Sequence, residues 1–118
     1  MEERAHWLKS AKDVRVQLKF SNLADLDLEI IIFEGTMNYG ADRSDNYVKM
    51  LYANFEMILQ FPEIGYKSHP EDFPDLRRVK SGSNMIFYYP HKNHIWVSRI
   101  AHERMDFSNM IFIDSDYE

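Results

Sequence analysis

The chain has 118 residues and a net charge of −5, and 45% of its residues are hydrophobic. This size and composition suit one folded domain with an ordinary core and argue against wholesale disorder. Cysteine is absent, which excludes disulfides, thiolate nucleophiles and cysteine-based zinc sites. No apolar run approaches the roughly 18 residues of a membrane span, and the N-terminus lacks the apolar segment of a signal peptide. We therefore expect a cytoplasmic protein that does not contact a membrane.

The first part of the chain predicts an extension, a strand and a helix. Residues 1–13 mix acids and bases, and we assign this N-terminal extension no function. Residues 14–20 alternate apolar and polar side chains, which is typical of a half-buried strand. Asn22 is a plausible helix cap, and Gly40 a stop, for a helix over about residues 23–38 with a weak point at Gly35. The apolar residues that predict this helix by their spacing are Leu23, Leu26, Ile30, Phe33 and Met37.

A second helix follows the first directly and ends before Pro62, so the two form a helical hairpin. Its broad apolar stripe is expected to pack in the core. The residues of this stripe are Tyr47, Val48, Leu51, Tyr52, Phe55, Ile58 and Leu59.

The second half of the chain predicts a loop over residues 62–75 and then strands at 76–80, 85–89 and 95–100. Short turns join these strands, so neighbours are expected to be antiparallel. The predicted fold is α+β, in the order β-α-α-β-β-β, with the hairpin on one face of an antiparallel sheet and the other face partly open. Residues 108–118 are expected to form an acidic C-terminal tail. Within this tail, residues 109–113 either form a short strand or dock loosely, and residues 114–118 are disordered.

Positive charge gathers in residues 76–107, where six Lys and Arg residues face two acids and give a local charge of +4. An anionic partner would explain this block, and so would protection of strand edges by cations. Both readings remain open on charge alone.

Several phrases occur in a fixed order along the chain: Pro62 and Gly65, Pro74-Asp-Leu-Arg77, Ile86-Phe-Tyr-Tyr89 and Arg99-Ile-Ala-His-Glu-Arg-Met-Asp106. Together with the order of elements they resemble the ParE branch of the ParE/RelE superfamily, the toxins of type II toxin–antitoxin modules. The resemblance covers about residues 16–107, and we take residues 14–107 as the toxin domain. It implies a helical hairpin on a curved sheet, a ParD-like antitoxin and a role in plasmid stabilisation.

The resemblance leaves two mechanisms open. RelE-like members cleave mRNA on the ribosome, which needs a base, an acid and cations around the scissile phosphate. The candidates for such catalytic roles are Arg77, Lys80, Arg99 and His102. ParE-like members instead inhibit DNA gyrase without catalysis, and the net negative charge and the Met105-Asp106 phrase favour this mechanism. Gyrase inhibition is the prediction, and a ribosome-dependent endoribonuclease is the alternative.

Contacts with the target or the antitoxin are expected along the C-terminal strands. The candidate residues are Arg77, Arg78, Tyr88, Arg99, His102, Arg104 and Asp106. Structural roles compete with two of these assignments: Arg77 in an ion pair with Glu29 or Glu34, and His102 in a hydrogen bond at the end of its strand. His91 and His94 have metal-like spacing but lack a third ligand, so we expect no metal and no cofactor.

The resemblance also implies how the toxin is silenced. A disordered antitoxin segment would fold onto the toxin, and its acidic tail would complement the positive block. Exposed apolar residues of the hairpin, such as Tyr39 or Tyr47, would then be binding surface. We expect a hetero-oligomer with the antitoxin, with a toxin dimer left open, and no direct binding of the toxin to DNA.

Overall fold

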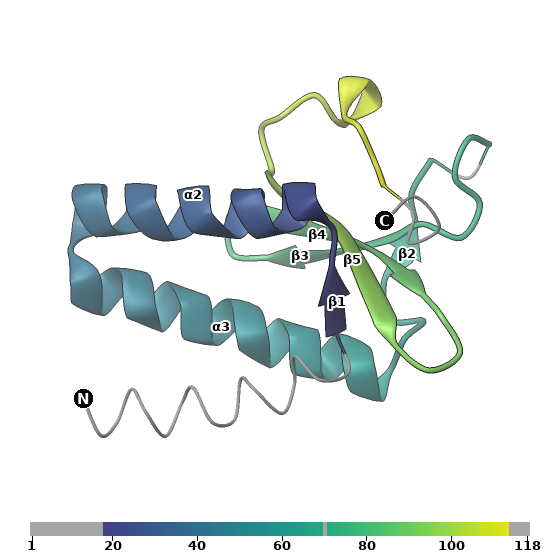
Figure 1. Cartoon of the computed structure of the whole chain (residues 1–118), viewed down its shortest axis with the longest axis horizontal. Coiled ribbons are helices and arrows are strands. Elements are labelled where there is room, and N and C mark those ends of the chain that lie inside the picture. Colours follow the sequence, from purple (N-terminus) through teal and green to yellow (C-terminus); the bar gives the residue numbers. More distant parts are fainter. Residues whose placement is uncertain (1–17, 70, 114–118) are drawn as a thin grey trace.

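The computed structural model describes residues 18–69 and 71–113. Within them, five strands and two long helices form an α+β fold in the predicted order (Figure 1). The elements are β1 (Leu18–Phe20), α2 (Asn22–Tyr39), α3 (Ala41–Gln60), β2 (Tyr66–Lys67), β3 (Arg77–Ser81), β4 (Asn84–Pro90), β5 (Ile95–His102) and the 3-10 turn η1 (Phe107–Asn109). The two-residue strand β2 lies inside the segment predicted as a loop. The predictions for residues 1–13, for the first part of the strand at 14–17 and for residues 114–118 fall outside the described residues.

The strands follow the order β1-β5-β4-β3-β2 in one sheet. From β2 to β5, each strand is antiparallel to the next, as the short turns between β3, β4 and β5 predict. Strand β1 runs parallel to β5, with Leu18 opposite Ile95. Both helices lie between β1 and the other strands in the sequence, so β1 is free to pair in parallel. The sheet is therefore mixed.

Helix α2 extends one residue beyond the predicted range 23–38 at each end, and its cap is Ser21 and not the predicted Asn22. Ser21 caps it by accepting a hydrogen bond from the Ala24 backbone N–H at 2.9 Å. Gly40, with φ +87°, ends α2 and begins α3. Helix α2 continues through Gly35, where an added Cβ atom would lie only 3.1 Å from Ser44 Oγ. The glycine therefore lets the two helices approach closely.

Helix α3 packs against the sheet through the predicted stripe. Val48, Leu51, Tyr52, Phe55 and Ile58 are buried. They meet the strand residues Ile86, Tyr88, Val97 and Ile100 in one core between helices and sheet. The prediction for the core of α3 is confirmed.

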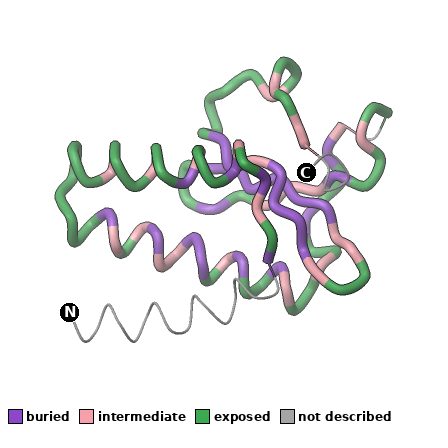
Figure 2. The backbone as a smooth tube through the Cα atoms, in the orientation of Figure 1, coloured by how far each residue is buried: buried purple, intermediate pink, exposed green. Residues whose placement is uncertain are grey.

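Helix α2 buries a different face from the one that its apolar spacing suggested. Its buried residues are Ala24 and Leu28. Leu26, Ile30, Phe33 and Met37, which predicted the helix, are 45–71% exposed. The hairpin extends beyond the sheet at the end where α2 meets α3 (Figure 1), and Figure 2 shows α2 exposed along most of its length. The helix is apolar on two sides, and only one of them is covered.

The second face of the sheet is covered by the chain's own C-terminal segment, residues 107–113. The Ile113 N–H donates to Ser98 Oγ at 2.8 Å, and Trp96 Nε1 donates to the Ile113 carbonyl at 2.5 Å. Met110, Phe112 and Ile113 of the predicted tail therefore pack against a second core. This core contains Leu76, Met85, Phe87, Tyr89, Trp96 and Ala101, with Phe73, Phe107, Met110, Phe112 and Ile113 packed against it.

Tyr88 anchors the loop after α3. Its ring is fully buried, its hydroxyl donates to the Pro62 carbonyl at 2.8 Å, and the Gly65 N–H donates to it at 3.0 Å. Burial raises the pKa of the Tyr88 hydroxyl, so it stays protonated and able to donate. The prediction that Tyr88 contacts a partner does not fit this position, because core packing encloses the side chain.

The variant Tyr88→Phe should lower the free energy of unfolding by about 1–3 kcal/mol, because it removes the hydrogen bonds to the buried Gly65 N–H and the partly buried Pro62 carbonyl. Urea unfolding followed by circular dichroism measures this change. Tyr39→Phe is the matched control, since Tyr39 is exposed. Equal midpoints for the two variants would contradict the anchoring role.

Candidate binding groove

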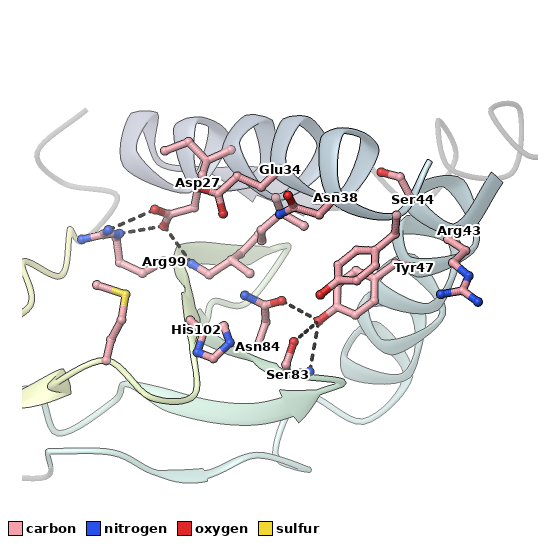
Figure 3. A pocket seen from close by; sticks show the side chains of 16 residues that line it. Asp27, Glu34, Asn38, Arg43, Ser44, Tyr47, Ser83, Asn84, Arg99 and His102 are labelled. Atoms are coloured by element: carbon pink, nitrogen blue, oxygen red, sulfur yellow. Dashed lines mark hydrogen bonds and ion pairs between the residues drawn. The ribbon is translucent and has the colours of Figure 1, made fainter. Parts of the chain in front are cut away.

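A groove of about 720 Å³ lies between α2, the start of α3, the start of β4 and the end of β5 (Figure 3). Its floor is mainly aliphatic, and polar groups stand around it. The lining residues are Asp27, Ile30, Ile31, Glu34, Gly35, Asn38 and Tyr39 from α2, Arg43, Ser44 and Tyr47 from α3, and Ser83, Asn84, Arg99, Ile100, His102 and Met105 from the sheet and the segment after it. Two acids and two arginines line it, so the groove carries no strong charge of either sign.

Asp27 and Arg99 form one end of the groove (Figure 3). The Asp27 carboxylate accepts hydrogen bonds from Arg99 Nε at 2.8 Å, from Arg99 Nη2 at 3.0 Å and from the Ile100 N–H at 3.0 Å. The two side chains are only 13% and 15% exposed, so the ion pair is largely desolvated. Arg99 Nη1 also donates to the Ile111 carbonyl at 3.1 Å, which links the pair to the C-terminal segment.

The Tyr47 hydroxyl forms the opposite end of the groove. It donates to the Asn84 side chain and accepts from the Ser83 N–H at 3.1 Å, so it holds the turn between β3 and β4 (Figure 3). Gly82 gives this turn its φ of +59°, and any side chain at Gly82 would clash with the Tyr47 ring. Tyr47 was predicted as core and as possible binding surface; it is half-buried and packs against the core, and its binding role stays a prediction.

Two cations of the positive block support the loop and the second face. Arg77 Nη1 donates to the Gly65 carbonyl at 2.6 Å and to the Glu63 carbonyl at 3.2 Å, and not to Glu29 or Glu34. The Arg78 guanidinium lies 4.8 Å from the centre of the Tyr66 ring. This stacking is a cation–π contact. Neither arginine is among the residues that line the groove.

The remaining candidates lie around the end of β5. Lys80 pairs with Glu103 at 3.0 Å on the surface, and this pairing lowers the pKa of Glu103. His102 Nδ1 accepts the Arg104 N–H at 3.1 Å. Asp106 caps η1, and its hydrogen bonds to Ser108 lower the pKa of its carboxyl. The turn after β5 is therefore held by local hydrogen bonds of the His102 and Asp106 side chains.

Arg99 and His102 are the only two of the four proposed catalytic residues that line the groove. The Arg99 charge is already balanced by Asp27, and Arg77 and Lys80 are engaged elsewhere. Among the described residues, Arg77, Lys80, Arg99 and His102 therefore do not form one cluster of free cations in the groove.

Sequence reasoning missed Asp27, Glu34 and Asn84 as groove residues. Asp27 carried a usable signal, because an acid between Leu26 and Leu28 in an apolar helix calls for a cationic partner. Glu34 and Asn84 carried none, since their roles depend on how the hairpin meets the sheet.

His91 and His94 come together at the turn between β4 and β5. Their rings stack with centres 4.8 Å apart. Burial lowers the pKa of His94, and the nearby charges of His91 and Lys19 lower it further. No cluster of three or more His, Cys, Asp or Glu residues that could hold a metal occurs in the part of the chain that the structure describes. Among the same residues, no helix is both long and apolar enough to span a bilayer.

The variant Asp27→Ala should lower the free energy of unfolding by roughly 2–3 kcal/mol, somewhat less than the loss of one partner from a fully buried pair. Removal of the carboxylate leaves the Arg99 guanidinium without its counter-ion and the Ile100 N–H without its hydrogen-bond acceptor. The matched control is Glu103→Ala in the exposed pair with Lys80, for which a loss below about 1 kcal/mol is expected. Urea titrations of both variants give the comparison, and equal losses would show that Asp27 has no special structural role.

Comparison with known proteins agrees with this architecture. Residues 18–107 match the family model described as the ParE toxin of the type II toxin–antitoxin system parDE. No curated protein matches the chain. Among solved structures, a chain of the "Chromosomal ParDE TA system from P. aeruginosa" superposes with a TM-score of 0.61 at 18% identity, covering 73% of this chain and 94% of that one. At this identity the superposition supports the fold alone. Since the family model spans most of its length, the chain belongs to the ParE toxin family of type II toxin–antitoxin systems.

Proposed function

We propose that the protein is a cytoplasmic toxin that inhibits DNA gyrase by binding it, that a ParD-like antitoxin neutralises it, and that the pair stabilises a plasmid or similar element. Membership of the ParE family is the starting point. The observation that supports gyrase binding over RNA cleavage is that the candidate basic residues are engaged within the fold. Arg77, Lys80 and Arg99 each have a partner within the fold.

This arrangement disfavours ribonuclease chemistry. Cleavage of RNA through its 2′-hydroxyl needs cations that are free to stabilise the phosphorane and a base and acid placed on either side of it. The Arg99 guanidinium would have to leave a largely desolvated ion pair with Asp27 first. A toxin of this design is better suited to recognition than to catalysis.

The groove is the proposed seat of the antitoxin. Its aliphatic floor, with Ile30, Ile31 and Ile100, would bury an apolar anchor of an incoming segment. Its rim offers both Glu34 and Arg43, so it can pair with either sign of charge. A segment that folds on binding suits such a surface, because it can spread many weak contacts over a large area of the groove and its rim.

Contact with gyrase is proposed for the turn after β5. His102 and Arg104 are exposed there, and Met105, 48% exposed, adds an apolar side chain beside them. An exposed Arg beside an apolar residue is a common centre of binding energy in protein interfaces. Arg77, Arg78, Arg99 and Asp106, also predicted as contacts, are proposed to act by holding the surrounding structure.

Induced expression in a bacterial host, with purified gyrase assays, tests the proposal. Gyrase inhibition predicts filamentous cells, a DNA-damage response, and loss of supercoiling with accumulation of cleaved DNA complexes in vitro. Cut mRNA with intact supercoiling would instead support the ribonuclease alternative and overturn the proposal.

The double variant His102→Ala/Arg104→Ala should weaken gyrase inhibition about tenfold or more, equivalent to about 1.4 kcal/mol or more of binding free energy. The concentration that halves supercoiling activity is the readout. Lys92→Ala is the matched control, an exposed cation in the turn at the opposite end of β5. A similar loss for the control would indicate a general charge effect, and unchanged inhibition by the double variant would remove this turn from the gyrase interface.

A further inference from the structure

Helix α2 presents a second apolar face that is separate from the core. Leu26, Ile30, Phe33 and Met37, named here the outer seam, repeat at intervals of four, three and four residues. At 100° per residue these positions fall on one side of the helix, opposite the buried Ala24 and Leu28. Such spacing is the pattern of a helix that packs against another helix.

The exposure of the outer seam is unusual for a folded domain. Phe33 is 65% and Met37 71% exposed, and the seam extends over about 16 Å of helix. A helix that is apolar on opposite sides is normally covered on both. In the described structure α3 and the sheet cover one side only, as Figure 2 shows.

Charge identifies the kind of helix that would fit. Helix α2 contains Asp25, Asp27, Glu29 and Glu34 and no Lys, Arg or His. Helical geometry places Glu29 on one flank of the seam and Glu34 on the other. Both are exposed. A second copy of α2 would bring acid against acid along both flanks, whereas Lys or Arg there would form favourable pairs.

We propose that the outer seam docks an amphipathic helix of a partner protein that carries apolar residues at heptad spacing and Lys or Arg on both flanks. The seam shares Ile30 with the binding groove, and its flanking residue Glu34 lies on the rim of that groove; Leu26, Phe33, Met37 and Glu29 lie outside the groove lining. The inference concerns the chemistry of a docking surface and does not depend on gyrase being the target.

Designed peptides test the proposal with the full chain. The probe is a synthetic 21-residue amphipathic helix with leucines at heptad spacing and Lys on both flanks; a second peptide carries Glu at the flanks. Fluorescence anisotropy should show the Lys-flanked peptide binding at least tenfold more tightly. The variant Glu29→Lys/Glu34→Lys should reverse this preference. Equal affinities of the two peptides for the unmodified chain, or a preference that the charge reversal does not change, would overturn the proposal.

Matched substitutions locate the contact. Phe33→Ser/Met37→Ser should weaken binding of the Lys-flanked peptide at least tenfold, and circular dichroism should be unchanged because both residues are exposed. Ile111→Ser is the control, since Ile111 is 66% exposed in the C-terminal segment. Equal effects of the two changes would overturn the assignment to the seam.

Photo-crosslinking separates the possible occupants without relying on loss of binding. The variant Phe33→p-benzoylphenylalanine is irradiated with the Lys-flanked peptide, and the products are identified by mass spectrometry. Crosslinks to the peptide support the proposal. A crosslinked dimer of the chain, or crosslinks to its own residues 1–17 that the peptide does not displace, would overturn it.

Discussion

The carboxylate of Asp27 joins the sheet edge, the helical hairpin and the C-terminal segment. Among the described residues, β1 pairs with β5 from Leu18 to Phe20, so the edge of β5 loses its partner strand after Val97. Side chains then continue the pairing: Ser21 Oγ donates to the Ser98 carbonyl at 2.6 Å, and Asp27 accepts the Ile100 N–H. Unpaired edge groups are costly when buried, so α2 has to lie where these side chains can reach. Arg99 balances the carboxylate and also holds Ile111.

Interactions within the fold also engage several cations of the positive block, so the sequence charge overstates the positive surface. The block of +4 in residues 76–107 suggests a positive surface, yet several of its cations act within the fold. Arg77 binds loop carbonyls, Arg78 stacks on an aromatic ring and Arg99 is paired. Asp25, Glu29 and Glu34 of α2 are exposed, and α2 contains no cation. Recognition by this domain should therefore depend more on shape and on exposed apolar side chains than on a general positive field.

Sequence patterns predicted helices and strands well where residues that are neighbours in the sequence decide the local structure. Helical apolar spacing, the stop at Gly40 and the turn residues placed the hairpin and the strands β3 to β5, although the observed cap of α2 is Ser21 and not the predicted Asn22. The patterns were insufficient where distant segments meet. The parallel partner of β1, the carbonyl contacts of Arg77 and the cover over Trp96 all depend on residues far along the chain. For α2 the apolar spacing identified a helix but not its buried side, because two apolar faces compete and the inner one uses small residues such as Ala24 and Gly35 to pack closely.

The folded domain extends further along the chain than the family match does, because the C-terminal segment completes its second core. Family similarity ends at residue 107, but the apolar face over Phe87 and Trp96 is closed by Phe112 and Ile113. An expression fragment cut at the edge of the family match would leave that face bare, and bare sheet faces promote self-association. Domain boundaries for this protein, and for any hybrid toxin built on it, should therefore be drawn beyond Ile113.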